Sequence, residues 1–495
     1  MKQFKQKYVS YLQYTFIAIS FFLFLYGNIK LIPNTILFGV LLLGMSNLLY
    51  GCIAPKRRIL FLIFNLVQFV FLGLRPFIDV LRTGQWVVWG VQEEYFAVRV
   101  LYLSFASLLI GAVLAEYIYK RRKGRCKAEA GKRSKGWLSA YESTQMKYIQ
   151  WIAGMMFLGT WMLHMLFEAE KLYFMQGKAY EVFYVEFSSK LPYALLVLAS
   201  MKRYFMCIYL ATFPKKRISF CVLTLSILSD IPIFLVGMRN PFVLSCLFAF
   251  VYYFIRDVLD DREKWIGKWE TLMIVIGAPC SITFLGAYAY IRAGMEVAIS
   301  GIGNLIVDFF YNQGISFQVL TAGRFVMSDL PQRAWRNYTF GGIIDYFTRG
   351  SIAQKFFGAE PLPNGNHIIN AMESNSLAHN MSYLSVGSED YLKGYGAGSS
   401  YLLETYIDFG YVGVAIFTII LGALLVYSLY WMKCNILIRT IILVALTTIF
   451  FIPRAEATGW IQSLIYMQFW IAIGFVYIGA GILRQLNQYR INQKH

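Results

Sequence analysis

The chain has 495 residues, of which 58% are hydrophobic and 15% charged, with a formal net charge of +19 at neutral pH. Runs of about 20 apolar residues recur along it, which is the length that crosses a bilayer core as a helix. These features exclude a soluble enzyme and predict a multi-pass membrane protein. Lys and Arg lie in the short connections between apolar runs, so the charge indicates membrane orientation, not nucleic-acid binding.

The seven cysteines indicate neither a disulfide framework nor a metal site. None has CxxC spacing, and none lies in a connection that we predict to be outside. They are Cys52, Cys126, Cys207, Cys221, Cys246, Cys280 and Cys434. The N-terminus has a basic start and an apolar run without a small-residue cleavage site, which predicts a retained first span.

The apolar runs predict an all-α polytopic fold with about twelve membrane spans. The first nine are expected at about 11–27, 32–52, 59–75, 96–118, 149–167, 191–211, 218–236, 241–255 and 271–291. The last three are expected at about 410–431, 436–452 and 460–482. The chain is therefore predicted to divide into spans 1–9 over 1–291, one large loop over 292–409, and spans 10–12 with a tail over 410–495.

The charges of the connections predict cytoplasmic N- and C-termini and an extracytoplasmic large loop. Residues 120–147 carry ten Lys/Arg against two Glu, whereas residues 293–409 carry six Lys/Arg against ten acidic residues. This asymmetry agrees with the positive-inside rule, and only the connection 256–270 is mixed. The sixth span contains Lys202 and Arg203, and the eighth is short. If either failed to cross, the loop would change sides.

Arginines recur at the ends of spans that we predict to face outward. They are Arg75, Arg82, Arg239, Arg292 and Arg454, with Glu456 beside the last. A guanidinium presents a planar fork of donors that suits phosphate or pyrophosphate. One such arginine can equally extend to lipid headgroups, but the set favours an anionic-ligand pocket. Arg239 is the strongest single candidate, because Gly237 and Pro241 restrict the short turn that carries it.

The large loop contains chemistry that a linker does not need. Residues 302–320 have helical apolar spacing and are expected to lie along the interface or to re-enter the membrane. Two of the four histidines, His367 and His379, lie in this loop. A neutral imidazole can take a proton from a sugar hydroxyl. The alternative for each histidine is a structural hydrogen bond.

The loop ends in KGYGAGSSYLLETYIDFG, residues 393–410. Gly394, Gly396 and Gly398 would let backbone amides approach a ligand closely, and a helix beginning near Ser399 would point its amides at an anion. Glu404 and Asp408 are spaced i and i+4, which places both carboxylates on one helix face. Glu404 is expected to act as a base or to bind sugar hydroxyls. The alternative is that both acids only stabilise the helix N-terminus.

A His-Asn pair, a Gly-rich run and an acidic residue before the next span resemble the Wzy-type polymerases of O-antigen and capsular polysaccharide. Those proteins have about a dozen spans and one large extracytoplasmic loop near the C-terminal end. GMRNP at 237–241 also resembles a turn of this group. The matching residues are His379, Asn380, Gly396, Gly398, Ser399, Glu404, Gly410 and Gly413.

The resemblance implies a GT-C-like glycosyltransferase that polymerises undecaprenyl-pyrophosphate-linked repeat units en bloc at the outer face of a bacterial plasma membrane. The product would be O-antigen, capsule or exopolysaccharide. Catalysis would need no metal or other cofactor, because arginines would neutralise the leaving pyrophosphate. The catalytic residues would be His379, Glu404 and Arg239. The substrate-binding residues would be Arg75, Arg82, Arg292, Arg454, Asn380, Gly396, Gly398 and Ser399.

The expected partners are lipid-linked oligosaccharides and membrane lipids, with a chain-length regulator and a flippase as further candidates and no nucleic acid. Two other functions remain open. An O-antigen-type ligase shares the loop and the Arg/His chemistry. A lipid-linked oligosaccharide flippase would show short outer loops and an internal repeat, which this sequence lacks, although Lys202 and Arg203 suit it. The sequence also leaves open whether His379 or Glu404 is the base.

Overall fold

The computed structural model describes residues 2–86, 90–129, 137–178, 182–259, 263–277, 279–281, 283–284, 286 and 302–493. These residues form helices and connections, with no strand among them. In a bilayer, a helix satisfies its own backbone polar groups. The predicted all-α fold is thus confirmed.

Eleven helices of the described part are long and apolar enough to cross a membrane. They match the predicted spans except the ninth, and part of 271–291 lies outside the described residues. The eleven are Gln6–Lys30, Pro33–Ile53, Pro55–Thr83, Val91–Arg121, Gln145–Phe174, Tyr193–Ala211, Lys216–Leu235, Arg239–Leu259, Tyr401–Trp431, Ile436–Arg454 and Met467–Tyr489. The prediction of spans from length and apolar composition is confirmed for these segments.

The chain divides into two compact units. Unit 1 comprises Met1–Glu116, Lys264–Tyr427 and Phe450–Gly459, and unit 2 comprises Tyr117–Glu263, Ser428–Ile449 and Trp460–His495. Two long helices, α5 (Val91–Glu129) and α22 (Tyr401–Trp431), contribute residues to both. Each unit is described below by itself.

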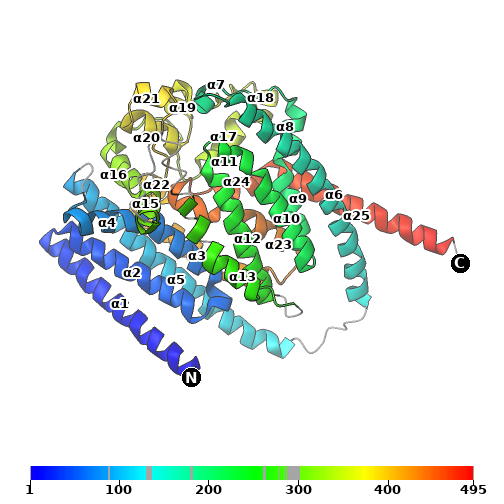
Figure 1. Cartoon of the computed structure of the whole chain (residues 1–495), viewed down its shortest axis with the longest axis horizontal. Coiled ribbons are helices and arrows are strands. Elements are labelled where there is room, and N and C mark those ends of the chain that lie inside the picture. The colour runs from blue at the N-terminus through cyan, green and yellow to red at the C-terminus, as the bar shows by residue number, and fades with distance from the viewer. Residues whose placement is uncertain are drawn as a thin grey trace. The chain divides into compact units, whose positions relative to one another are not determined.

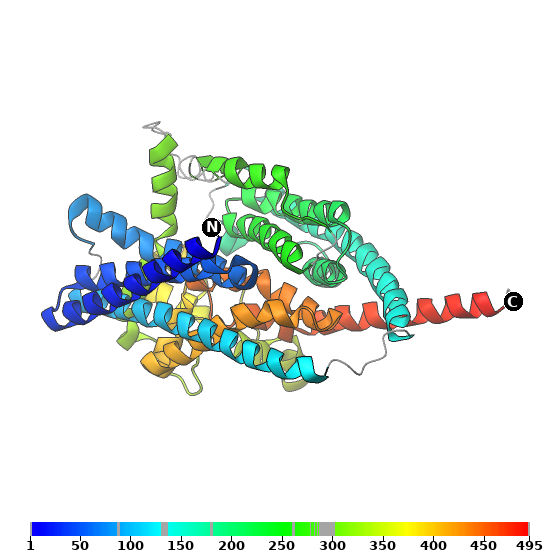
Figure 2. The same cartoon turned by 90° about the horizontal axis from the view of Figure 1, so that it is seen from below.

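The N-terminal helices form the first part of unit 1. Helix α1 (Lys2–Lys30) lies along α2 (Pro33–Ile53), and both are blue in Figures 1 and 2. The next rod is made of α3 (Pro55–Gln68), the π-helical turn η1 (Phe69–Gly73) and α4 (Leu74–Thr83). After a long gap in the sequence come α13 (Lys268–Leu272) and the π-helical turn η3 (Met273–Gly277).

A buried polar cluster ties α22 to the N-terminal helices of unit 1. The Tyr401 hydroxyl lies 2.8 Å from both Gln68 Oε1 and Ser104 Oγ, and the Gln68 amide donates to Ser104 at 2.9 Å. All three side chains are buried. Hydrogen bonds of this kind hold membrane helices together, because lipid offers no alternative partner.

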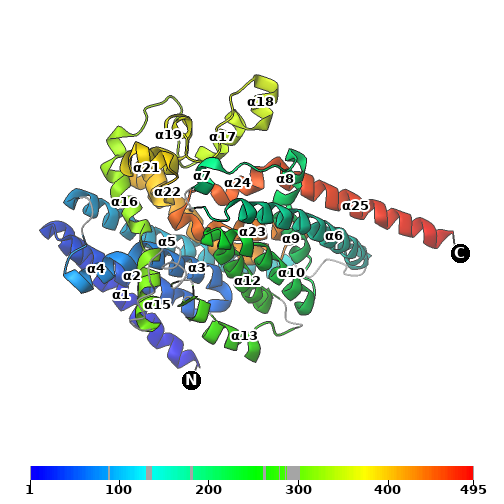
Figure 3. The same cartoon turned by 45° about the horizontal axis from the view of Figure 1, so that its top comes forward.

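Residues 302–392 of unit 1 form short helices and turns. They are α15 (Ile302–Gln313), α16 (Ser316–Phe325), the 3-10 turn η4 (Met327–Asp329), α17 (Gly341–Arg349), α18 (Ser351–Phe357), α19 (Ile368–Glu373), α20 (Leu377–Ser385) and α21 (Ser388–Leu392). Figure 1 shows α16, α19, α20 and α21 grouped near the start of α22, and Figure 3 shows α16, α19 and α21 there from another side. The predicted helix at 302–320 is present in two pieces, which Gly314 and Ile315 separate.

Unit 2 is built around the long helix α6 (Trp137–Phe174), which packs on α9 (Lys202–Ala211) and α25 (Met467–Asn492). Its other elements are α7 (Val182–Glu186), α8 (Tyr193–Ser200), α10 (Lys216–Ser229), α11 (Ile231–Leu235), α12 (Arg239–Leu259), α23 (Ile436–Leu446) and, but for its first residue, α24 (Gly459–Ile465). The 3-10 turn η5 (Ile449–Arg454) begins in unit 2 and continues in unit 1. The predicted sixth span consists of α8 and α9, and the predicted seventh span consists of α10 and α11, so both are interrupted helices.

Candidate active site

His379 is held by a tyrosine hydroxyl in unit 1. Its Nδ1 lies 2.8 Å from Tyr391 Oη, and Tyr391 Oη donates to the His367 carbonyl at 3.2 Å. A carbonyl only accepts, so the tyrosine proton belongs to that second bond and His379 Nδ1 carries a hydrogen. This hydrogen-bond pattern assigns the tautomer in which Nε2 keeps its lone pair. Nε2 makes no hydrogen bond to any residue that the structure describes.

Burial sets the ionisation of this pair. It lowers the pKa of His379 below the ordinary value of 6.5, because a partly buried imidazolium loses hydration. It raises the pKa of Tyr391 to about 12, which keeps the phenol protonated. The imidazole is therefore neutral at neutral pH and can accept a proton at Nε2.

His367 has a structural hydrogen bond, as the alternative reading of the loop histidines allowed. Its Nδ1 accepts from the Ile369 amide at 3.1 Å and so caps the N-terminus of α19. Its carbonyl is the acceptor that orients Tyr391. Between the two loop histidines, the geometry favours His379 as the proton acceptor.

Asn380 is buried, at 1% exposure, and uses its whole amide within the protein. Its Oδ1 accepts from Tyr338 Oη at 2.8 Å and from Arg333 Nη2 at 3.5 Å. Its Nδ2 donates to the carbonyls of Asn370 and Ser374 at 3.2 and 3.3 Å. This geometry does not favour the predicted substrate contact. Instead, Asn380 fixes α20 and thereby the neighbouring His379.

Arg333 and Tyr338 were not singled out from the sequence. Arg333 donates to the Glu373 and Ser374 carbonyls as well as to Asn380. Tyr338 is buried, and burial raises the pKa of its hydroxyl to about 12. The only sequence feature that could have indicated them is a tyrosine that closely follows two arginines in RAWRNYT. The sequence alone does not link this tyrosine to Asn380, which lies 42 positions later.

The glycine run turns back onto α20. Gly394 and Gly398 adopt φ values of +106° and +83°, in the left-handed region that glycine enters without a Cβ penalty. Between them, the Ala397 amide donates to Ser382 Oγ at 2.9 Å, and a Cβ on Gly396 would come within 3.4 Å of the same oxygen. These backbone groups contact the protein itself, so their predicted contact with a ligand gains no support here.

Glu404 is fully buried near the start of α22. It accepts from Ser399 Oγ at 2.6 Å and from the Ala457 amide at 2.7 Å. Ser399 is buried as well, at 3% exposure. The carboxylate thus joins two segments of unit 1. Of the two predicted bases, His379 rather than Glu404 has the accessible geometry.

Asp408 anchors the middle of the loop to α22. It accepts from the Tyr338 amide at 2.8 Å and from the Thr339 amide and hydroxyl at 2.6 and 2.7 Å. The two predicted acids, Glu404 and Asp408, both lie on α22, which begins at Tyr401. The helix is interrupted at Gly410, where φ is +64°, and this is the residue at which the tenth span was predicted to begin.

Three of the predicted arginines contact α15. Arg75 Cζ and Arg82 Cζ lie 4.3 and 5.4 Å from the centroid of the Tyr311 ring. Arg454 Nη1 donates to Gln313 Oε1 at 3.3 Å. The structure thus brings Arg75, Arg82 and Arg454 to one helix of unit 1.

Arg82 and Arg75 differ in exposure. Arg82 forms a long contact of 3.7 Å with Asp308, and half of its side chain is exposed. Arg75 Nε is buried without a hydrogen-bond partner in the described part of the chain. A buried guanidinium nitrogen that lacks a partner favours an anionic ligand nearby. Burial and the charge of Asp345 raise the pKa of Glu456.

The remaining two arginines are placed differently. Arg239 begins α12 in unit 2, two residues after Gly237 (φ +111°). Arg292 lies outside the described residues. No group of three or more His, Cys, Asp or Glu side chains suited to a metal occurs among the described residues. Metal independence stays a prediction.

The family model of the O-antigen polysaccharide polymerase Wzy matches residues 11–487, nearly the whole chain. The chain belongs to this family. It is thus a multi-pass polysaccharide polymerase that joins O-antigen repeat units. No curated protein and no solved structure matches it. The Wzy match extends the resemblance from the two motifs to almost the full length.

Proposed function

We propose that this Wzy-family protein transfers a growing glycan from undecaprenyl pyrophosphate to a hydroxyl of a second lipid-linked repeat unit. The reaction would occur at the outer face of the bacterial plasma membrane, with both chain termini in the cytoplasm. The observation that carries the proposal is the Tyr391–His379 hydrogen bond, which leaves Nε2 of a neutral imidazole free to accept a proton.

In the proposed step, the acceptor hydroxyl oxygen attacks the anomeric carbon of the donor glycan. The bond from this carbon to the carrier pyrophosphate breaks, and the pyrophosphate leaves with the electron pair. The hydroxyl proton passes to His379 Nε2, as general base catalysis requires. One glycosidic bond forms and one glycosyl-phosphate bond breaks, so no oxidant or further reactant is needed.

The leaving pyrophosphate requires positive charge. Arg75, Arg82 and Arg454 contact α15 and would supply it from unit 1. Arg239 is proposed as a further catalytic arginine and Arg292 as a binding one, both from the sequence. Guanidinium groups stabilise such charge as it develops, so we propose a metal-independent reaction without a cofactor. Asn380, Ser399, Glu404 and Asp408 would act as positioning residues.

The proposed substrates are lipid-linked oligosaccharides, and the surrounding lipids are a further contact. A chain-length regulator and a flippase are proposed partners, because polymerisation needs a supply of translocated units and a limit on chain length. The family match favours polymerisation over the ligase and flippase alternatives.

His379→Ala and Arg239→Ala test the proposal in cells. Each should abolish long chains while single repeat units still reach the surface, and a His367→Asn variant, which keeps a capping side chain, should retain long chains. Normal chain lengths in both alanine variants would overturn the site. Lipid-linked units that accumulate on the inner face would favour a flippase. A reporter fused near Asn366 should give an extracytoplasmic signal.

A further inference from the structure

Unit 2 contains a cavity of about 430 Å³, which the proposed reaction does not use. Charged and polar side chains line it, among them His164, Lys202, Arg203, Asp230, Ser245 and Thr448. They belong to helices long and apolar enough to cross the membrane. Ionisable groups within such segments are costly and mark functional sites by default.

Three membrane spans are interrupted at this cavity. Helix α8 stops before α9 at Met201, α10 stops before α11 at Asp230, and α23 gives way to a turn at Thr447 and Thr448. Irregular backbone at membrane depth is tolerated where it is buried in protein or lines a cavity, and interrupted helices form the substrate sites of many membrane proteins. The convergence of three interruptions indicates a ligand site.

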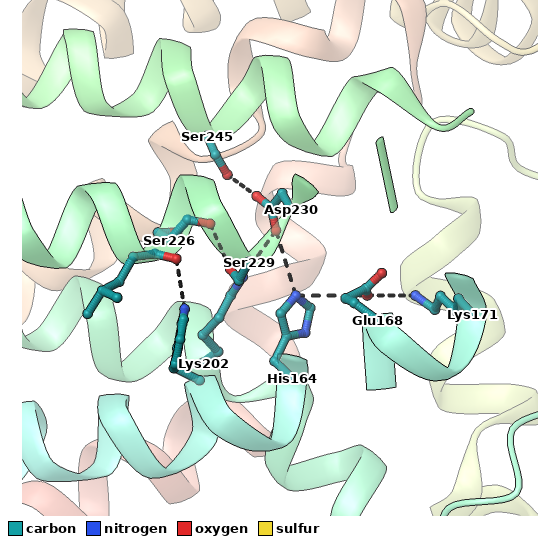
Figure 4. A network of polar contacts seen from close by, with 10 residues as sticks. His164, Glu168, Lys171, Lys202, Ser226, Ser229, Asp230 and Ser245 are labelled. Carbon is teal, nitrogen blue, oxygen red and sulfur yellow. Dashed lines mark hydrogen bonds and ion pairs between the residues drawn. The ribbon is translucent and has the colours of Figure 1, made fainter. Parts of the chain in front are cut away.

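The charges around the cavity compensate each other, as Figure 4 shows. Asp230 Oδ1 lies 3.2 Å from Lys202 Nζ and 3.6 Å from His164 Nε2, and Asp230 also accepts from Ser245. Glu168 Oε1 lies 2.7 Å from Lys171 Nζ and 3.8 Å from His164. Asp230 is thus paired with Lys202, and Glu168 is paired with Lys171. Because Lys202 is already paired, it does not provide a free positive charge for a phosphate.

Several polar groups of the cavity are left for a ligand. Thr448 Oγ1 is buried without a hydrogen-bond partner among the described residues, and His164 Nε2 has only its two long contacts, to the Asp230 and Glu168 carboxylates. Among the described residues, the Arg203 guanidinium makes one hydrogen bond, to the Tyr204 hydroxyl at 3.3 Å, and it leaves further donors. Pro241, Leu244 and Phe248 add apolar surface. Donors and acceptors beside apolar walls match a sugar ring, whose hydroxyls do both and whose C–H faces are apolar.

We propose that this cavity binds a sugar ring of the lipid-linked repeat unit, with Asp230, His164 and Thr448 contacting its hydroxyls. The inference rests on the proposed function and adds a glycan-binding site to it. The volume suits one or two sugar rings. Met238, Asn240 and Pro241 also line the cavity. The turn that carries Arg239, the proposed pyrophosphate ligand, is therefore part of its wall.

Binding to the purified full-length protein in lipid nanodiscs tests this assignment. One probe is the lipid-linked repeat unit extracted from cells that lack the polymerase, and the other is undecaprenyl pyrophosphate without sugar. Thr448→Val removes one hydroxyl at nearly constant volume and should weaken binding of the glycan probe about fivefold. Asp230→Asn should weaken it about tenfold or more. Binding of the sugar-free carrier should stay unchanged in both variants.

The matched control is Thr440→Val, which alters a buried threonine of α23 that does not line the cavity. Unchanged affinity of both cavity variants for the glycan probe would overturn the inference alone. An equal loss for both probes would assign the cavity to the pyrophosphate and also overturn it. If the unmodified protein binds neither probe, the proposed function fails, and the inference fails with it.

Discussion

The hydrogen bond of 2.8 Å between His379 Nδ1 and Tyr391 Oη joins two short helices, α20 and α21, of unit 1. The ring of Tyr391 also meets the imidazole edge-on, with centroids 6.0 Å apart. The imidazole is thereby fixed in both tautomer and orientation. A base held in this way acts only on a hydroxyl that approaches Nε2. The fixed imidazole would therefore select which hydroxyl of the acceptor sugar is deprotonated.

Tyr391→Phe should lower the rate of polymerisation about tenfold to a hundredfold without abolishing it. The variant keeps the ring contact but loses the hydroxyl, so the tautomer and orientation of His379 are no longer fixed. The rate is measured with extracted lipid-linked repeat units. Tyr383→Phe is the matched control, because its ring packs on Tyr391 and its hydroxyl makes no hydrogen bond to a described residue. Equal rates in the two variants would remove Tyr391 from the mechanism.

The pH dependence of the rate should show the lowered pKa of His379. Burial disfavours the imidazolium, so the acid limb of the profile should lie below the ordinary histidine value of 6.5. The unfolded chain binds a proton at this histidine more readily than the folded chain does. The free energy of unfolding is therefore highest above pH 6.5 and decreases as pH falls from 6.5 through the lower folded-state pKa. His379→Gln should give a low rate without this limb. An acid limb above 6.5 would argue against His379 as the base.

The spans were predictable because length and apolar composition alone determine which segments can cross a bilayer. The spacing of Glu404 and Asp408 correctly placed them on one helix. The partners of these groups were not predictable. Asp408 accepts from residues 70 and 69 positions earlier, and such pairings depend on how the loop folds, which no local pattern encodes.

The sequence also did not predict which motif residues are buried. A His-Asn pair reads equally well as two substrate contacts or as one base beside one structural amide. Only the hydrogen bonds of Asn380 to Tyr338 and Arg333 separate the two readings. Likewise, His367 and His379 are equivalent by residue type. The capping bond from the Ile369 amide distinguishes the first from the second.

Asn380→Ala should destabilise the short-helix segment of unit 1, residues 302–400, by about 2–4 kcal/mol. The variant removes the acceptor of the buried Tyr338 hydroxyl and one of the two side-chain donors to each of the Asn370 and Ser374 carbonyls, and lost buried hydrogen bonds are costly. The expected result is faster limited proteolysis of residues 330–400 together with loss of polymer. Asn364→Ala, at an exposed position, is the control. A variant with normal protease resistance but no polymer would restore a direct substrate contact for Asn380.

Gly422→Ala should destabilise unit 1 by about 2–4 kcal/mol, because α5 and α22 cross there in backbone contact. A Cβ on Gly422 would lie 2.2 Å from the Leu108 carbonyl oxygen, and one on Gly111 would lie 2.0 Å from that of Ile419. Backbone atoms cannot move aside as a flexible side chain can, so the helices must separate. Since α22 also carries Asp408, which anchors the loop, polymerisation should decline as well.

The thermal unfolding midpoint of the purified protein measures this effect. Gly474→Ala in α25 is the matched control, since nothing lies within 4 Å of the added Cβ and alanine favours a helix more than glycine does. Its midpoint should be unchanged or slightly higher. A Gly422→Ala variant as stable as Gly474→Ala would show that α5 and α22 do not cross as closely as described. The anchoring of the loop by Asp408 would then not depend on this helix crossing.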